Sequence, residues 1–374
     1  MTYLEAILLT CFRAFKGDRS HSAVFHLLTG KKTSQTIQDA HLYEVTEFFQ
    51  VFPSLSRERF DHNVSSLREK GYLLEKGKDR YDITETAKIQ VDDFFLNHIF
   101  PSNLKGWAYH DQATLFWRRL TLLVQSLSNF NHDEQRFYPV QRDPNIQGWV
   151  RKTFNSWKNN RKHWTENLHK ELSFICHQET FPDKQDWLIH QLSGYKLVGE
   201  TLQQLAMHFN VNEDEAHFRF LNIVHYSIGI INNNPQKCRL LRYILQDGIE
   251  KSLVLTSSTE KTYHLVKKNK LINEIALLRR LKESTIEDHI IELALMVPDF
   301  PIDSYVNPPL QKEIRSVVSR ANHSRLREMK EQLPGVSFFQ IRLVLVKDRR
   351  ENNKWKSYLK KYSDTAHSEK GKKK

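Results

Sequence analysis

The sequence is poor in glycine and cysteine and contains no long apolar run. Its 374 residues include 12 glycines and three cysteines. Because phosphate-binding loops depend on glycine, a glycine content of about half the average disfavours a nucleotide-binding enzyme. Cys11, Cys176 and Cys238 are far apart and odd in number, which argues against a disulfide framework and favours a reducing cytoplasm. Without 18 consecutive apolar residues or a signal-peptide pattern, we expect neither a membrane span nor a secretory signal.

Motifs for catalysis and metal binding are also missing. The segment Thr29–Thr33 has a Gly-Lys pair but lacks the spacing of a phosphate-binding loop. The 18 histidines form no HExxH motif and no paired Cys/His spacing, so we expect them to be scattered over surface and core. We therefore predict no enzymatic activity, no cofactor and no metal site.

The positive charge is concentrated near the C-terminus. The chain has a formal net charge of +12, and residues 310–374 hold 18 Lys/Arg against 7 Asp/Glu, a net of +11. Residues 1–309 are therefore nearly neutral. A concentrated basic segment indicates a polyanionic partner, with nucleic acid first, although a solubilising tail would have the same composition.

The N-terminal part is predicted to be helical. Apolar residues at helical spacing indicate helices over Tyr3–Phe15 and Ser22–Leu28, with Gly30 ending the second. A third helix is predicted from Ser34 to Phe52, where Pro53 breaks the pattern.

The next segment has the element order of a winged helix. A helix over Ser56–Lys70 precedes a strand over Tyr72–Leu74, a turn, a returning strand over Arg80–Thr84 and a further helix from Thr84. This string resembles many winged-helix domains, in which the Ser56–Lys70 helix would be the recognition helix. The resemblance implies DNA contacts by the arginines of this helix, and a structural or dimerising domain is the alternative. The arginines are Arg57, Arg59 and Arg68.

A basic, aromatic segment stands out in the helical middle region. Residues 147–164 have a net charge of +5 and no acidic residue. Val150, Trp157 and Trp164 follow the spacing of one helix face, which favours a packed core beneath a solvated basic face. Contact with a phosphate backbone is compatible with this packing, because the cations lie off the apolar stripe. The cations are Arg151, Lys152, Lys158, Arg161 and Lys162.

Residues 259–295 have the pattern of a helix-turn-helix core. Thr262 and Leu265 lie on a first helix, Ile275 and Ala276 on a second, and Ile286 and Ile290 on a third. Ser284 to Glu287 fit the S-x-x-E pattern that caps a helix start.

The same segment resembles the helicase-type helix-turn-helix module at the C-terminus of RecQ-family helicases. The matching residues are Thr262, Leu265, Glu274-Ile275-Ala276, Arg279, Leu281-Lys282, Ser284-Thr285-Ile286, His289-Ile290, Leu333-Pro334, Ser337-Phe338 and Ile341-Arg342. With the string Gly30–Tyr43, the whole chain resembles the YpbB-type proteins of Gram-positive bacteria, which carry the module on a separate chain. This resemblance implies a RecQ-type helicase as partner.

Three positions depart from the module's pattern. Arg280 replaces a frequent glycine in the turn, so we expect the turn to use another conformation. Asn269 replaces another frequent glycine, and Leu271 stands where Ser or Thr usually caps the second helix. These changes weaken local capping and leave the fold intact.

The recognition helix of this module is acidic. From Lys282 to Leu293 the net charge is −3, which would repel the phosphates on either side of a major groove. We therefore expect either DNA contacts at one end, through Arg279, Arg280 and Lys282, or a protein partner on this face. We favour the protein partner. The predicted partner-binding residues are Glu283, Glu287, Asp288 and Glu292.

The C-terminal segment combines cations with aromatic residues. A helix is predicted over Leu310–Leu333, and Trp355, Tyr358 and Tyr362 follow among further cations. Exposed aromatics beside cations suit single-stranded nucleic acid, whereas their spacing equally fits one helix face packed on the body. Residues 363–374 are expected to be disordered. The predicted DNA contacts here are Arg320, Arg325, Arg327, Arg349, Arg350 and Lys354.

Together these patterns predict a mainly α-helical, cytoplasmic protein, with nucleoid association possible in a bacterium. Its expected parts are a winged-helix-like domain (1–98), a helical middle domain (99–255), a helix-turn-helix domain (256–346) and a basic tail (347–374). The predicted function is a non-catalytic, DNA-binding accessory of a RecQ-type helicase in repair or recombination, on single-stranded or forked DNA. A sequence-specific transcription regulator and a protein-interaction scaffold are the alternatives.

Overall fold

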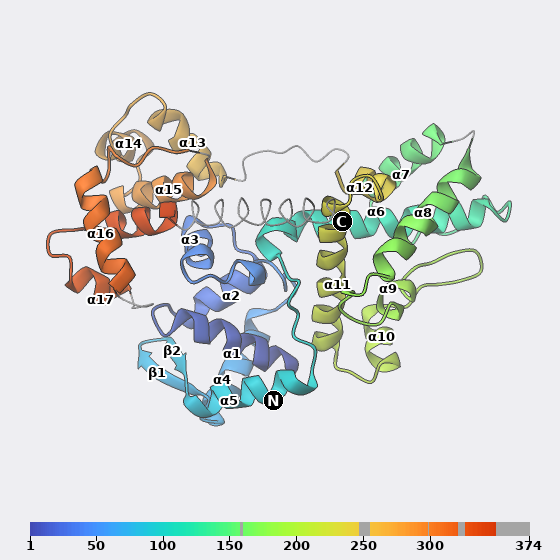
Figure 1. The fold of residues 1–374 in the computed structure, drawn as a ribbon, viewed down its shortest axis with the longest axis horizontal. Helices are drawn as coiled ribbons and strands as arrows, with labels where there is room; N and C mark the ends of the chain where they lie inside the picture. Colours follow the sequence, from blue (N-terminus) through green and yellow to red (C-terminus); the bar gives the residue numbers. More distant parts are fainter. Residues whose placement is uncertain (158–159, 247–254, 298, 321–325, 349–374) are drawn as a thin grey trace, which may run out of the picture.

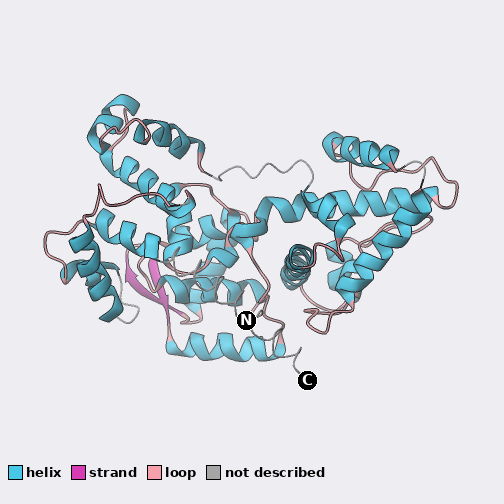
Figure 2. Cartoon of the chain, turned by 45° about the horizontal axis from the view of Figure 1, so that its top comes forward, coloured by secondary structure: helices cyan, strands magenta, loops and turns pink. Residues whose placement is uncertain are grey.

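The structure is a computed structural model that describes residues 1–374 except 158–159, 247–254, 298, 321–325 and 349–374. The side chains of residues 161, 320 and 327 also lie outside the description. The described part is mainly α-helical, as predicted, and its strands form one two-stranded sheet (Figure 2). No described helix is both long and apolar enough to cross a membrane.

The N-terminal part is built around α1, which is buried along most of its length. Thr2 and Glu5 form a reciprocal capping box at its start, and it packs against α2, α4, α5 and β2. The elements here are α1 (Tyr3–Phe15), α2 (His21–Thr29), α3 (Ser34–Leu42), the short 3-10 helix η1 (Thr46–Phe48), α4 (Arg57–Glu69), β1 (Leu73–Gly77), β2 (Arg80–Ile83) and α5 (Glu85–Asn97).

The predicted order of helix, hairpin and helix is present. The strands β1 and β2 are antiparallel, with Leu73 opposite Ile83, and Thr84 caps α5 through its side chain. The assignment of this part to the winged-helix class stays a prediction. The single helix predicted over 34–52 was wrong, because α3 ends at Leu42 and Glu44 adopts a left-handed conformation with φ 55°.

The middle part surrounds α6 and α11, the two longest helices. Gly106 starts α6 against the N-terminal part, where an added Cβ would lie 2.1 Å from the carbonyl oxygen of Phe49, so only glycine fits. On α11, Phe218 stacks on Tyr3 with ring centroids 5.7 Å apart. The elements are α6 (Gly106–Phe130), α7 (Pro144–Ser156), α8 (Arg161–Cys176), α9 (Asp186–Ile189), α10 (Leu202–His208), α11 (Glu213–Asn233) and α12 (Arg239–Gln246).

The C-terminal part begins with the three predicted helices of the helix-turn-helix core. In Figure 1 α15 lies next to α3, with α13 and α14 beyond it, and the three helices are far from α8 to α10. Helical residues occupy both parts of the range 310–333 that the structure describes; residues 321–325 lie outside the description, so one continuous helix there stays a prediction. The elements are α13 (Ser257–Val266), α14 (Ile272–Arg279), α15 (Glu283–Met296), α16 (Pro308–Arg320) and α17 (Leu326–Glu331), and residues 338–348 are also helical.

Candidate nucleic-acid interface

The helix-turn-helix core is held together by apolar packing and by one arginine. Ile275 on α14 and Ile286 and Ile290 on α15 are fully buried. Arg279, at the end of α14, donates to the carbonyl oxygen of Ser258 at 2.8 Å and also to the hydroxyl of Thr262. Desolvation lowers the pKa of Arg279, which is consistent with its inward position. This side chain therefore ties α14 to the start of the module, and its predicted DNA contact would compete with these hydrogen bonds.

The turn between α14 and α15 places two cations on the surface. Arg280 has φ 53°, the left-handed conformation that glycine supplies in this position, so the expectation of another turn conformation was wrong. The next helix, α15, begins after its N-cap residue, Lys282. The predicted cap at Ser284 was therefore also wrong, since Ser284 already lies in the first helical turn. Arg280 and Lys282 are both exposed.

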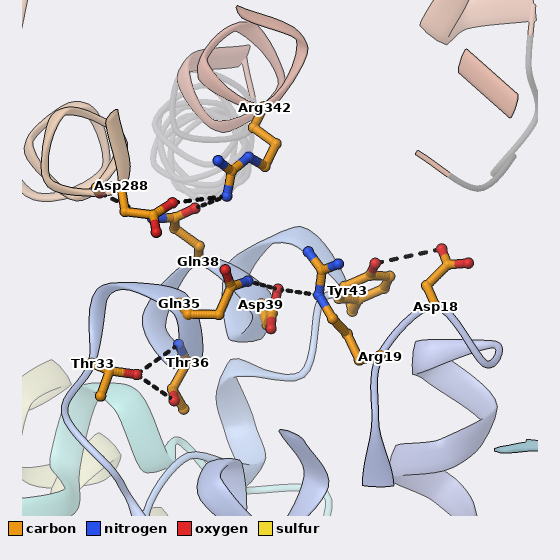
Figure 3. Close-up of polar contacts among 10 residues, drawn as sticks. All are labelled: Asp18, Arg19, Thr33, Gln35, Thr36, Gln38, Asp39, Tyr43, Asp288 and Arg342. Carbon is orange, nitrogen blue, oxygen red and sulfur yellow. Dashed lines mark hydrogen bonds and ion pairs between the residues drawn. The ribbon is translucent and has the colours of Figure 1, made fainter. Parts of the chain in front are cut away.

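The recognition helix α15 is covered by α3 of the N-terminal part. Ile37 and Leu42 of α3 belong to the same apolar cluster as Ile291 and Leu295 of α15. Gln38 of α3 donates to the backbone carbonyl of Asp288 at 3.0 Å. Figure 3 shows these two helices meeting beside the helix that carries Arg342.

Arg342 joins the three helices at this interface. Its guanidinium donates to Gln38 Oε1 at 2.9 Å and to Asp288 Oδ1 at 3.0 Å. On the other side of α3, Arg19 donates to Asp39 at 2.8 Å, so α3 is fixed from both sides (Figure 3). Burial raises the pKa of Asp39, and the charge of Arg19 opposes this shift.

Glu292 lies inside the structure. It is fully buried and accepts hydrogen bonds from Ser34 of α3 at 2.6 Å, from the backbone N–H of Thr256 at 2.6 Å and from Thr259 of α13 at 2.6 Å. A buried carboxylate is tolerated when its oxygens are this well satisfied. The prediction that Glu292 faces a partner was therefore wrong, because its side chain is enclosed within the chain. Asp288 is half-buried and pairs with Arg342, and its contact with a partner stays a prediction.

The other two predicted partner-binding acids line a groove. Glu283 and Glu287 face a hollow of about 1100 Å³ beside α13 and the segment that follows α15. Burial raises the pKa of Glu287. The groove also carries Lys267, Lys270 and the aromatic ring of Tyr305. Its mixed charge and aromatic lining suit a peptide better than a uniformly negative nucleic acid.

The arginines of α4 are engaged within the chain. Arg57 donates to Asp61 at 2.8 Å, and Arg59 donates to both carboxylate oxygens of Asp214 on α11. Arg68 lies over the ring of Tyr81, 5.5 Å from its centroid. Each side chain would give up a contact in order to bind DNA, so α4 is a weaker candidate than its charge suggests.

The basic segment of the middle part has its apolar stripe in the core, as the sequence predicts. Val150 and Trp157 are buried, and Trp157 stacks on Trp164 with ring centroids 4.6 Å apart. Arg151, Lys152 and Lys162 are exposed on the opposite face. These three cations are therefore accessible for contacts with phosphates.

A second groove, of about 700 Å³, lies where α8 meets α12. Its one carboxylate among the described lining residues is Glu171, which is occupied in accepting the N–H groups of Leu240 and Leu241 at 3.0 and 2.8 Å. Cations and aromatic rings line the rest. The sequence did not reveal this groove, because its residues come from two helices about 70 positions apart. They include Trp157, Trp164, Tyr243, Lys170, Lys237 and Arg239.

Eight of the predicted DNA contacts lie outside the described residues or side chains. They are Lys158, Arg161, Arg320, Arg325, Arg327, Arg349, Arg350 and Lys354.

Comparisons with known proteins support the assignment of the C-terminal part to a helix-turn-helix domain. A family described as a helix-turn-helix domain matches residues 258–345. Over 355 residues the chain is 32% identical to Protein YpbB of Bacillus subtilis (strain 168), which covers 93% of this chain and 98% of that protein. No solved structure matches the chain.

Proposed function

The chain belongs to the YpbB family, and we propose that it is a non-catalytic DNA-binding protein that works with a RecQ-type helicase in DNA repair or recombination. The observation that carries DNA binding is the helix-turn-helix domain over residues 258–345. The helicase partner is supported by the resemblance of this domain to the C-terminal module of RecQ-family helicases. A domain that some organisms keep on the helicase could act on the same DNA from a separate chain.

The mode of binding follows from the position of α15. A helix-turn-helix protein normally inserts this helix into the major groove. Here α3 covers one face of α15, and the acidic side chains leave only Arg280 and Lys282 as cations at its exposed start. We infer that DNA is held through its phosphates and unstacked bases, with little reading of base edges.

The groove between α8 and α12 is the proposed site for single-stranded DNA. Trp164 and Tyr243 offer ring faces for base stacking, which is worth about 1–3 kcal/mol per base. Lys170, Lys237 and Arg239 are exposed and can neutralise phosphates. This combination tolerates any sequence, as a helicase accessory requires.

A role as a sequence-specific transcription regulator is less well supported than the role as a helicase accessory. Such a protein needs an accessible reading helix on each half-site. The packing of α15 against α3 through Gln38, Asp288 and Arg342 opposes it.

Fluorescence anisotropy with a labelled single-stranded oligonucleotide tests the DNA-binding claim. We expect the double variant Lys237→Gln/Arg239→Gln to weaken binding about tenfold, since two phosphate contacts are removed. The matched control is Lys184→Gln/Lys196→Gln, which removes the same charge from exposed positions elsewhere in the middle part. Equal losses in both variants would contradict a site in this groove, and no binding by the native chain at low salt would contradict DNA binding.

A further inference from the structure

Two histidines and a glutamate converge beside α9 and α10, away from both grooves. His190 follows α9, Glu200 precedes α10 and His208 ends α10. The Nδ1 atoms of His190 and His208 lie 2.9 and 3.4 Å from the same carboxylate oxygen of Glu200. Within the described part of the chain, this is the one group of three such side chains whose ligand atoms all lie within 4.8 Å of one another.

The backbone builds this cluster before any ligand arrives. The N–H of Glu200 donates to the carbonyl of His190 at 2.7 Å, which closes the loop between them. Gly199 permits this closure, because an added Cβ would lie 2.3 Å from the carbonyl oxygen of Gln191. The hydroxyl of Ser193 accepts from the N–H of Gly199 at 3.0 Å. Thr201 then caps α10, which brings His208 back to the loop.

One atom of the cluster is unsatisfied. Glu200 Oε2 is buried and receives no hydrogen bond within the described part of the chain. A carboxylate oxygen without a donor costs free energy, and a cation held by both carboxylate oxygens, Oε1 facing the histidines and Oε2 beside it, would supply the missing partner.

The spacing fits a tetrahedral transition-metal ion. Zinc binds His nitrogen at about 2.0–2.1 Å and carboxylate oxygen at about 2.0–2.2 Å, so tetrahedral ligands lie about 3.3–3.5 Å apart. The 3.4 Å between His208 Nδ1 and Glu200 Oε1 matches this spacing. The 2.9 Å between His190 Nδ1 and the same oxygen is a hydrogen bond that a bound ion would replace after a small opening of the pair. Two imidazoles disfavour Mg²⁺ and Ca²⁺, which prefer oxygen ligands.

We propose that His190, Glu200 and His208 bind a divalent transition-metal ion, with zinc as the best match. The three side chains are 32%, 30% and 43% exposed, so solvent can supply the fourth ligand. The ion joins the end of α9 to both ends of α10. It stabilises the 190–200 loop independently of DNA or helicase binding.

Cobalt substitution of the metal-free full chain tests the site. After removal of metal with a chelator, titration with Co²⁺ should give the visible absorption of a tetrahedral complex, with one equivalent bound per chain. Zinc should displace the cobalt, and it should raise the melting temperature of the native chain by several degrees.

Variants assign the signal to the three residues. Changing a residue that merely orients a metal ligand weakens binding about 10–100-fold, so loss of a ligand should cost at least as much. We expect this for Glu200→Gln and for His208→Ala, with circular dichroism confirming that each folds. His177→Ala is the matched control, because His177 is an exposed histidine at the end of α8. Absence of the cobalt spectrum in the native chain, or its equal retention in the ligand variants, would overturn the proposal.

Discussion

At the residue scale, several charged side chains that the sequence predicts to be surface contacts form hydrogen bonds within the chain. The sequence predicts a partner contact for Glu292 and Asp288 and a DNA contact for Arg279. In the structure each of the three forms hydrogen bonds with other residues of the chain. The sequence could predict that α15 is acidic. It could not predict that α3, more than 240 residues earlier, packs against α15, because no local pattern encodes a contact between such distant segments.

Replacing Glu292 tests its internal role. Glu292→Ala should destabilise the protein by about 3 kcal/mol, because the backbone N–H of Thr256 and the hydroxyls of Ser34 and Thr259 lose their acceptor. Urea unfolding measures the change. The exposed Glu283→Ala serves as the control and should fall within about 0.5 kcal/mol of the native chain. Similar small effects for both would contradict the role.

A buried histidine predicts how stability depends on pH. Burial lowers the pKa of His225 to about 3, and its Nδ1 accepts the N–H of Lys105 at 3.0 Å. The unfolded chain binds this proton below pH 6.5 whereas the folded chain stays neutral, so stability falls as pH drops from 6.5 toward 3. His225 should account for about 2 kcal/mol of loss between pH 6.5 and 5.

Urea unfolding at several pH values measures this dependence. His225→Gln keeps an acceptor for Lys105 but does not titrate, so the slope of stability against pH should decrease by about one proton. An unchanged slope would assign the acid sensitivity to other groups.

At the element scale, helices were predictable and the connections between them were not. The bounds of α1 and the helix–hairpin–helix order of α4 to α5 follow from apolar spacing and capping residues. The break after Leu42 depends on a positive φ at Glu44, a residue type that gives no such signal. The groove between α8 and α12 depends on tertiary packing, which periodicity does not contain.

The turn at Arg280 links stability to binding. A non-glycine residue in the left-handed region costs about 1 kcal/mol, so Arg280→Gly should stabilise the protein by up to that amount. The same change removes an exposed cation and should weaken DNA binding if this end contacts phosphates. Thermal unfolding and anisotropy together check the two effects. Lower stability of the glycine variant would contradict the claim that Arg280 is strained. Unchanged affinity for DNA would exclude this turn from the DNA interface.

At the scale of the whole molecule, positive charge is concentrated at the C-terminal end of the sequence. Residues 349–374 contain ten Lys/Arg and three Asp/Glu. Deletion from 310 onward would also remove Ile341, Leu343 and Val344, which are buried in the helix-turn-helix core. A test of the basic segment should therefore begin after residue 348, the last residue that the structure describes.

Deletion of residues 349–374 should reduce the salt dependence of DNA binding. Each phosphate contact to a single strand contributes about 0.7 to the slope of log K against log salt concentration, so loss of three contacts should lower the slope by about 2. Anisotropy titrations between low and physiological salt measure it. An unchanged slope would show that this segment does not contact DNA.

The helicase partnership is the central claim, and size-exclusion chromatography tests it most directly. The purified chain would be mixed with the RecQ-type helicase of its own organism after nuclease treatment, so that DNA cannot bridge the two proteins. We predict a shared peak that the charge-reversed variant Glu283→Lys/Glu287→Lys loses, because these residues line the groove beside α13. Two separate peaks for the native proteins at micromolar concentration would contradict the account.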